Sequence, residues 1–250
     1  MQVSRGPTHP ALEPFVAGLG YSESHGPSVR EVSIPTGCAQ LFVNLHADAF
    51  TGAAGGAAVL GAASRPSVID TADQRAIVWV AFKPGGAFPF FPPEPGLVTL
   101  EDHWGRAGAV VRERLLEAGG PAGILDSLES VLLEMGDLDR DPVLEAAVRA
   151  LDRGAPVGEV ADGLGLTRRR LIGLFHDRVG LTPKRFARVR RFQRTLRRIP
   201  YDHPADWAGL AFTCGYADQS HLIRDFRDFA GLRPGEYRPR SPGQPNHVPL

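Results

Sequence analysis

The pattern of apolar and polar positions changes once along the chain, near residue 100. Before that point, short runs of β-branched and aromatic residues stand between Gly, Pro, Asp and Asn, a pattern typical of strands. We expect strands over 40–46 and 76–82, and weaker ones over 29–34 and 57–60. Short strands with little helical periodicity between them favour a small β-sandwich or barrel.

A proline-rich segment follows the last of these strands. Residues 83–95 hold five prolines in thirteen positions. Proline removes a backbone donor and fixes φ, so this segment cannot form a regular element. We expect a loop that packs its phenylalanines into the domain.

Helical periodicity begins at about residue 106. Apolar positions between 110 and 118 fit one helix, which Gly119-Gly120-Pro121 would end. A second helix has a broad apolar stripe, made of Ile124, Leu125, Leu128, Val131, Leu132 and Met135. The stripe packs against its own domain or, as the alternative, forms a homodimer seam through helices 107–135. We expect residues 1–136 to form a β-rich domain with a helical extension, and its candidate roles are sensing and dimerisation.

The polar stretch 136–141 is the predicted linker to an all-α half. Asp141-Pro142 fits an N-cap followed by proline in the first helical turn, and the pattern from there to 240 is helical. The final residues, 241–250, show no periodicity, and we expect them to be disordered. The fold class predicted for the chain is thus α+β with two domains.

Two segments of the helical half share one layout. Each has a short helix with a small residue, Ala161 or Ala211, and a glycine four residues later, Gly165 or Gly215. Glycine suits the positive φ of a tight turn, and apolar positions resume at helical spacing after it. This layout is a helix-turn-helix present twice. A single copy would be weak evidence, but two copies favour DNA binding over an all-α packing domain.

The charge distribution supports this interpretation. The 28 basic and 28 acidic residues balance over the whole chain, but residues 141–240 carry 19 basic against 12 acidic side chains. Residues 1–140 carry 9 basic against 16 acidic ones. Only two of the basic residues are lysines, which indicates GC-rich bacterial coding, so the segregation of charge is more informative than the abundance of arginine.

A cationic helix is predicted between the two motifs. Residues 181–200 hold eight basic side chains and no acidic one. Thr182-Pro183 opens the helix, and its apolar stripe consists of Phe186, Val189, Phe192, Leu196 and Ile199. Such a helix lacks the opposite charges that normally stabilise an exposed face. We expect it to face a polyanion, which would relieve the repulsion.

These residues resemble the DNA-binding domain of AraC/XylS-type transcriptional regulators. The stretch 215–238 is similar to the family's second helix-turn-helix with its closing Pro-x-x-Tyr-Arg, and the cationic helix is similar to the helix that joins the two motifs. Residues 8–118 resemble an N-terminal domain that accompanies this module in some members, through 82–88 and 100–105. The resemblance implies an AraC-type DNA-binding domain over 141–240.

The resemblance also implies which residues meet DNA. Two recognition helices would enter successive major grooves, where arginine can bind guanine and glutamine can bind adenine through paired hydrogen bonds. The implied base-reading residues are Arg168, Arg169, Arg170, Ile172, Gln219, Ser220, His221 and Arg224. The implied phosphate contacts are Thr167, Lys184, Arg185, Arg188, Arg191 and Arg227.

Three points stay open within this assignment. Gly173 stands where many members carry a base-reading arginine. The base specificity of the first recognition helix therefore depends on Arg169 and Arg170 or is weak. His221 contacts either a base or a phosphate. Arg224 reads a base or instead forms a surface ion pair with Asp228 one turn away.

Composition argues against other classes of protein. The two cysteines, Cys38 and Cys214, are isolated, which excludes a disulfide framework and a cysteine-rich zinc site. No apolar stretch is long enough for a membrane span or a secretory signal, so we expect a cytoplasmic protein without membrane contact. Nucleophile elbows and phosphate-binding loops are absent from the sequence.

One alternative is a cupin-like β-domain enzyme with an accessory nucleic-acid-binding module. It would need clustered metal ligands, and His46 with Asp48 is the only suggestive pair in the N-terminal half. We expect no catalytic residue, no metal and no cofactor. The expected partner is double-stranded promoter DNA, while RNA polymerase, a small-molecule or protein effector and a second copy of the chain remain open.

Overall fold

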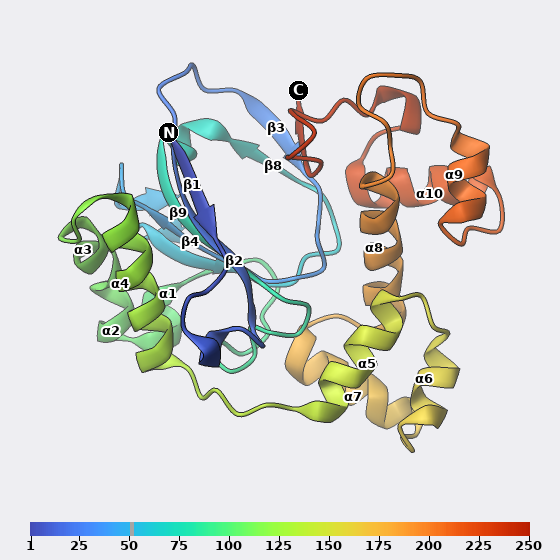
Figure 1. Ribbon diagram of the computed structural model, residues 1–250, viewed down its shortest axis with the longest axis horizontal. Helices are drawn as coiled ribbons and strands as arrows, with labels where there is room; N and C mark the ends of the chain where they lie inside the picture. Colours follow the sequence, from blue (N-terminus) through green and yellow to red (C-terminus); the bar gives the residue numbers. More distant parts are fainter. Residues whose placement is uncertain (51–52) are drawn as a thin grey trace.

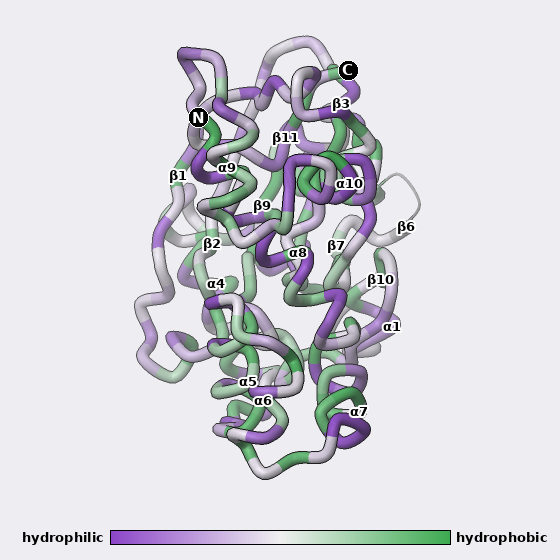
Figure 2. Tube along the Cα trace, turned by 90° about the vertical axis from the view of Figure 1, so that its right-hand side faces the viewer, coloured by the Kyte–Doolittle hydropathy of each residue, from purple (hydrophilic) through white to green (hydrophobic). Residues whose placement is uncertain are grey.

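The computed structural model describes residues 1–50 and 53–250. A β-rich half contains the N-terminus, and a helical half lies beside it (Figure 1). The helices of the second half are α5 (Pro142–Asp152), α6 (Val157–Gly163), α7 (Arg168–Val179), α8 (Pro183–Leu196), α9 (Trp207–Thr213) and α10 (Gln219–Ala230). Figure 2 faces this half and shows α9 and α10 on one side of α8, with α5, α6 and α7 on the other. The predicted α+β class is confirmed.

The β-rich half is built on a six-stranded antiparallel sheet in the order β1-β2-β9-β4-β7-β10. Its strands are β1 (Gln2–Arg5), β2 (Val16–Glu23), β9 (Ala76–Phe82), β4 (Gln40–Asn44), β7 (Ala57–Leu60) and β10 (Leu97–Thr99). A small ladder pairs β5 (Ala49–Phe50) with β6 (Ala53–Ala54). The sequence predicted β4, β7 and β9 and missed β1, β2 and β10.

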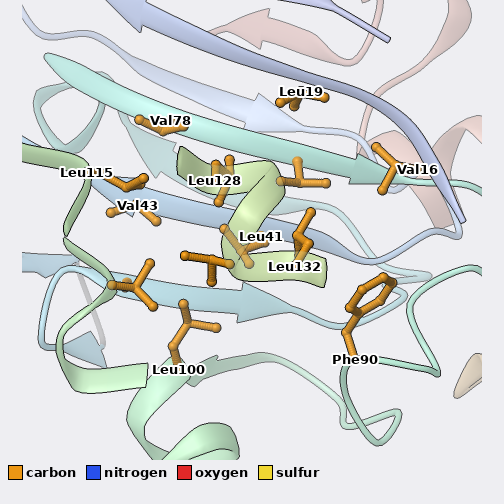
Figure 3. Packing of buried hydrophobic residues seen from close by; sticks show 14 of the residues in the cluster. Val16, Leu19, Leu41, Val43, Val78, Phe90, Leu100, Leu115, Leu128 and Leu132 are labelled. Carbon is orange, nitrogen blue, oxygen red and sulfur yellow. The ribbon is translucent and has the colours of Figure 1, made fainter. Parts of the chain in front are cut away.

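One face of this sheet is covered by the helix α4 (Gly120–Met135). Leu128 and Leu132 of α4 point at Leu19, Leu41 and Val78 of the sheet, and all five are buried (Figure 3). The predicted apolar stripe is therefore used inside its own domain. The alternative in which this stripe forms a dimer seam is wrong, because its side chains already lie in the core.

The helical extension before α4 is more broken than predicted. It consists of α1 (Leu100–Trp104), α2 (Arg106–Ala109) and α3 (Val111–Leu116). The chain bends at Val110, which is exposed, and this bend directs Val111 and Leu115 into the core. The helix predicted from the apolar positions 110–118 is present as the shorter α3, and two further short helices, α1 and α2, precede it. Among the described residues, no helix is both long and apolar enough to cross a bilayer.

The loop over 83–95 packs as predicted. Phe90 and Phe91 are buried against Phe82 at the end of β9, with ring centroids 5.3 and 6.0 Å from it. Trp104 stacks on Phe91 and donates its indole N–H to the Phe90 carbonyl at 3.0 Å. The phenylalanines thus pack into the core from a segment that forms no regular strand or helix.

A second, three-stranded sheet pairs the C-terminal end of the chain with a strand of the β-rich half. Its order is β11-β3-β8, where β3 is Arg30–Ser33, β8 is Ser67–Asp70 and β11 is His247–Pro249. The predicted disorder of residues 241–250 is wrong, because β11 pairs with β3 and buries Val248. The prolines do not prevent this, since β11 is an edge strand and needs pairing on one side only.

Candidate nucleic-acid interface

The first helix-turn-helix consists of α6 and α7, joined by a glycine turn. Gly165 has a φ of +65°, and the N–H of Leu166 donates to the Ala161 carbonyl at 2.9 Å. Thr167 caps α7, because its hydroxyl oxygen accepts from the N–H of Arg170 at 3.2 Å. The local sequence therefore sets both the turn and the start of the recognition helix.

The second helix-turn-helix, α9 and α10, repeats this construction. Gly215 has a φ of +77°, and the N–H of Tyr216 donates to the Ala211 carbonyl at 2.9 Å. Asp218 caps α10 by accepting from the N–H of His221 at 2.7 Å. The two copies predicted from sequence spacing are thus formed by the same turn.

Substituting Gly215 by alanine is expected to cost about 1–2 kcal/mol of stability. The cause is the positive φ alone, because a Cβ at this position would meet nothing within 4 Å. Gly173→Ala is the matched control, since Gly173 has equally open surroundings inside α7, where alanine should add about 0.5–1 kcal/mol. Urea unfolding measures both variants, and equal stabilities would show that the turn does not depend on the left-handed conformation.

Most of the predicted base-reading side chains lie at the surface of α7 and α10, which Figure 1 places at opposite ends of α8. The exposed ones are Arg168, Arg169, Arg170, Ile172, Gln219, Ser220 and Arg224. None of these arginines forms an ion pair with a side chain that the structure describes. The predicted alternative of an Arg224–Asp228 pair is wrong, because Asp228 pairs with Arg188 at 2.7 Å instead. These side chains are available to a ligand.

His221 differs from the other residues of this set. Its Nε2 lies 2.9 Å from Nη2 of Arg191 on α8, so the neutral imidazole accepts from the guanidinium. Burial and the charge of Arg191 both lower the pKa of His221, which favours that neutral form. This contact links α10 to α8, while a contact of His221 with a base or a phosphate stays a prediction.

The acid-free helix α8 finds its acidic partners on other helices. On one side, Asp152 at the end of α5 accepts from Nε of Arg190 at 2.6 Å, and its backbone carbonyl accepts from Arg194. The prediction that α8 needs a polyanion to relieve its own repulsion is therefore wrong. Acidic groups distant in sequence neutralise much of its charge.

On the other side of α8, the buried Asp225 of α10 binds two arginines. Its carboxylate accepts from Arg188 at 2.7 Å and from Arg191 at 2.9 Å, and its side chain is 0% exposed. The Arg191 guanidinium also lies 4.2 Å from the centre of the Tyr216 ring. Paired buried charges of this kind fix the position of one helix on another. Asp225 is thus a positioning residue for the second recognition helix.

Sequence reasoning missed Asp225, although the signal was present. Asp225 lies three residues after Leu222 and four residues before Phe229, and both of these are buried. Helical periodicity therefore places this carboxylate on the apolar face of α10. An aspartate at such a position requires a cationic partner.

Three of the six predicted phosphate contacts turn inward. They are Arg185, Arg188 and Arg191. Arg185 donates to the Ser64 carbonyl of the β-rich half and lies 4.7 Å over the Phe229 ring. Each of these guanidinium groups has partners within the protein, and its contact with phosphate stays a prediction. The three that remain exposed are Thr167, Lys184 and Arg227.

The suggested metal pair of the N-terminal half lies in an asparagine-stabilised turn. The carboxamide oxygen of the buried Asn44 accepts from the N–H groups of His46 and Ala47 at 3.0 and 3.1 Å. The side chains of His46 and Asp48 are both exposed. In the part of the chain that the structure describes, no three His, Cys, Asp or Glu side chains form a group suited to a metal ion.

Family comparisons agree with the motifs. Residues 160–240 match the helix-turn-helix domain family, and residues 4–99 match a domain of unknown function, DUF6597. A curated protein from Streptomyces antibioticus, which carries the provisional name AraC-like transcription regulator, is 30% identical over 102 residues. That match covers 39% of this chain, and this chain spans about a third of that relative (33%). These matches support the AraC/XylS-type resemblance that the sequence predicted for the helical half.

Solved structures of ToxT from Vibrio cholerae are similar at low identity. One structure at 1.65 Å resolution has a TM-score of 0.41 and 12% identity, covering 94% of this chain and 97% of ToxT. Another, bound to (E)-4-(8-methylnaphthalen-1-yl)but-3-enoic acid, has a TM-score of 0.43 and 13% identity, covering 88% and 96%. A likeness at this level defines neither a ligand nor a function for this chain.

Proposed function

We propose that this protein is a sequence-specific DNA-binding transcription regulator. In this proposal α7 and α10 enter successive major grooves of promoter DNA, and the β-rich half modulates that binding in response to an effector. RNA polymerase is a further candidate partner, and the bacterial cytoplasm is the compartment where such a regulator would act. No enzymatic role is proposed, because no observation favours one over regulation.

The observation that carries the proposal is the repeated helix-turn-helix. Both copies present a recognition helix with exposed arginine or glutamine side chains, and α8 joins them. A duplex offers its major groove once per helical turn, so two such helices suit two neighbouring grooves. Arginine and glutamine are also the side chains that distinguish guanine and adenine.

The direct test is a footprint of the full chain on genomic promoter fragments. We expect one protomer to protect an asymmetric site with two centres about 34–36 Å apart, and binding to weaken steeply with salt. The full chain is needed because Val32, Ile34 and Val248 share a core with the second motif, and a fragment of 141–240 would lack them. A footprint limited to a short perfect palindrome would contradict the proposed arrangement.

Substitutions of Arg224 and Arg227 distinguish base recognition from binding to the phosphate backbone. Arg224→Ala is expected to cost about 1–3 kcal/mol and to relax preference at one or two base pairs. Arg227 is also exposed on α10, and its loss should weaken all sequences about equally and lower the salt slope by about one unit. Binding of both variants to matched and scrambled sites across a salt series makes the comparison. If Arg224→Ala lowered the affinity for matched and scrambled sites equally, Arg224 would not be a base-reading residue.

A further inference from the structure

The last residues of the chain, 240–250, are here named the strap. They leave the helical half and end beside β3 and β8 of the β-rich half (Figure 1). Both ends of β11 continue the pairing with β3, because the N–H of Ile34 donates to the Asn246 carbonyl at 2.8 Å and the N–H of Leu250 donates to the Arg30 carbonyl at 2.9 Å. The strap is therefore a hydrogen-bonded part of the sheet.

The strap is also bonded to the helical half. The Tyr237 hydroxyl donates to the Pro245 carbonyl at 2.7 Å. The buried Gln193 of α8 donates to the side chain of Asn246 at 2.8 Å and to the Pro35 carbonyl at 2.9 Å. One side chain of α8 thus holds the strap and the β3 segment together.

A buried carboxylate anchors the strap on β3. Glu31 is 0% exposed, and its Oε1 lies 2.6 Å from Nδ1 of His247. Its other oxygen, Oε2, lies 3.5 Å from Nη1 of Arg240 and has no hydrogen bond within the described chain. Because a buried carboxylate needs cationic partners, Glu31 favours the state in which the strap is attached.

The second motif shares its hydrophobic core with this sheet. Val32, Ile34 and Val248 belong to the same buried cluster as Phe226 and Phe229 of α10. The first motif differs, because the buried members of its cluster all lie within residues 144–186, while Phe88 packs against the cluster half-buried and Pro93 lies beside Gly180 at the end of α7. The dependence on the N-terminal half is thus concentrated on the second motif.

The strap does not cover the surface that would read DNA. Gln219, Ser220, Arg224 and Arg227 of α10 are exposed with the strap in place, whereas the strap contacts the core side of the same motif. A steric block of DNA binding is therefore not what this geometry provides. An attached strap instead restricts where α10 can lie.

From these contacts we infer that the strap and β3 position the second recognition helix, so that the β-rich half controls the second DNA contact separately from the first. This inference rests on the proposed function. Its physical basis is that detaching the strap removes one wall of the core under α10 and leaves the core under α7 intact.

Val248→Asp in the full chain tests the inference, and Leu250→Asp is the matched control, because Leu250 lies in the same strap but is 68% exposed. Amide hydrogen exchange is compared for α10 and α7, and footprint strength is compared at the two ends of the protected site. In Val248→Asp we expect exchange in α10 to speed up about tenfold or more with α7 unchanged. Protection of the second half-site should weaken about tenfold with the first retained.

Several results would overturn the inference. They are unchanged exchange in α10, equal acceleration in both helices, or equal weakening of both half-sites. If Val248→Asp fails to fold, His247→Ala removes only the contact with Glu31, and the same asymmetry between α10 and α7 is then required. A wild-type chain that binds no DNA would defeat the proposed function, while the exchange comparison would still decide whether the strap holds α10.

Discussion

Replacing Asp225 by alanine should lower the free energy of unfolding by about 3–5 kcal/mol. The carboxylate is fully buried, and the side chains of its partners, Arg188 and Arg191, are only 29% and 19% exposed. Without Asp225, two partly buried guanidinium groups would face each other with one counter-charge fewer. Removing one partner of a buried ion pair costs far more than the pair contributes, because the remaining charge stays desolvated.

Asp228→Ala is the control for this prediction. Asp228 also binds Arg188 at 2.7 Å, but its side chain is 47% exposed. An exposed ion pair contributes less than about 1 kcal/mol. Urea unfolding followed by circular dichroism compares the two variants, and similar losses would contradict the assignment of Asp225 as a positioning residue.

The second large effect is expected for Phe192→Ala, at about 3–5 kcal/mol. Phe192 of α8 is fully buried, with its ring centroid 4.9 Å from Phe226 and 5.4 Å from Phe229. Its removal would leave a cavity between α8 and α10 in addition to the lost burial. Phe212→Ala is the control, because Phe212 is 85% exposed on α9, and its loss should change stability by less than about 0.5 kcal/mol. The same denaturation series distinguishes the two, and a small loss for Phe192 would mean that the second motif does not depend on this cluster.

The two helix-turn-helix motifs could be predicted because their signals are local. Gly165 and Gly215 adopt positive φ in turns closed by bonds between residues five apart. The caps Thr167 and Asp218 act over three residues. Such features are present in any short window of the sequence, so spacing alone identified both motifs and their recognition helices.

Strand β2 could not be predicted in this way, because its glycines oppose a strand locally. Glycine in a strand interior weakens it. In the folded sheet, however, a Cβ at Gly20 would lie only 2.5 Å from the ring of Trp79, which is opposite it on β9. The glycine is required by a neighbour 59 positions away in the chain, and no local propensity contains that information.

The sequence by itself determined the helix-turn-helix pair, the apolar stripes of α4 and α8, and the strands β3, β4, β7 and β9. Each of these depends on side chains within one or two helical turns or on the residue pattern along one strand. Tertiary structure alone decided which arginines have acidic partners within the protein and which do not. The partners of Arg188, Arg190 and Arg191 are aspartates 34 to 40 positions away, so a charge count over 181–200 could not reveal them. The position of residues 247–249 beside β3 was also decided by the fold alone. A strand that pairs with another more than 200 positions away is specified by that partner strand and by the hydrophobic core that the two strands cover.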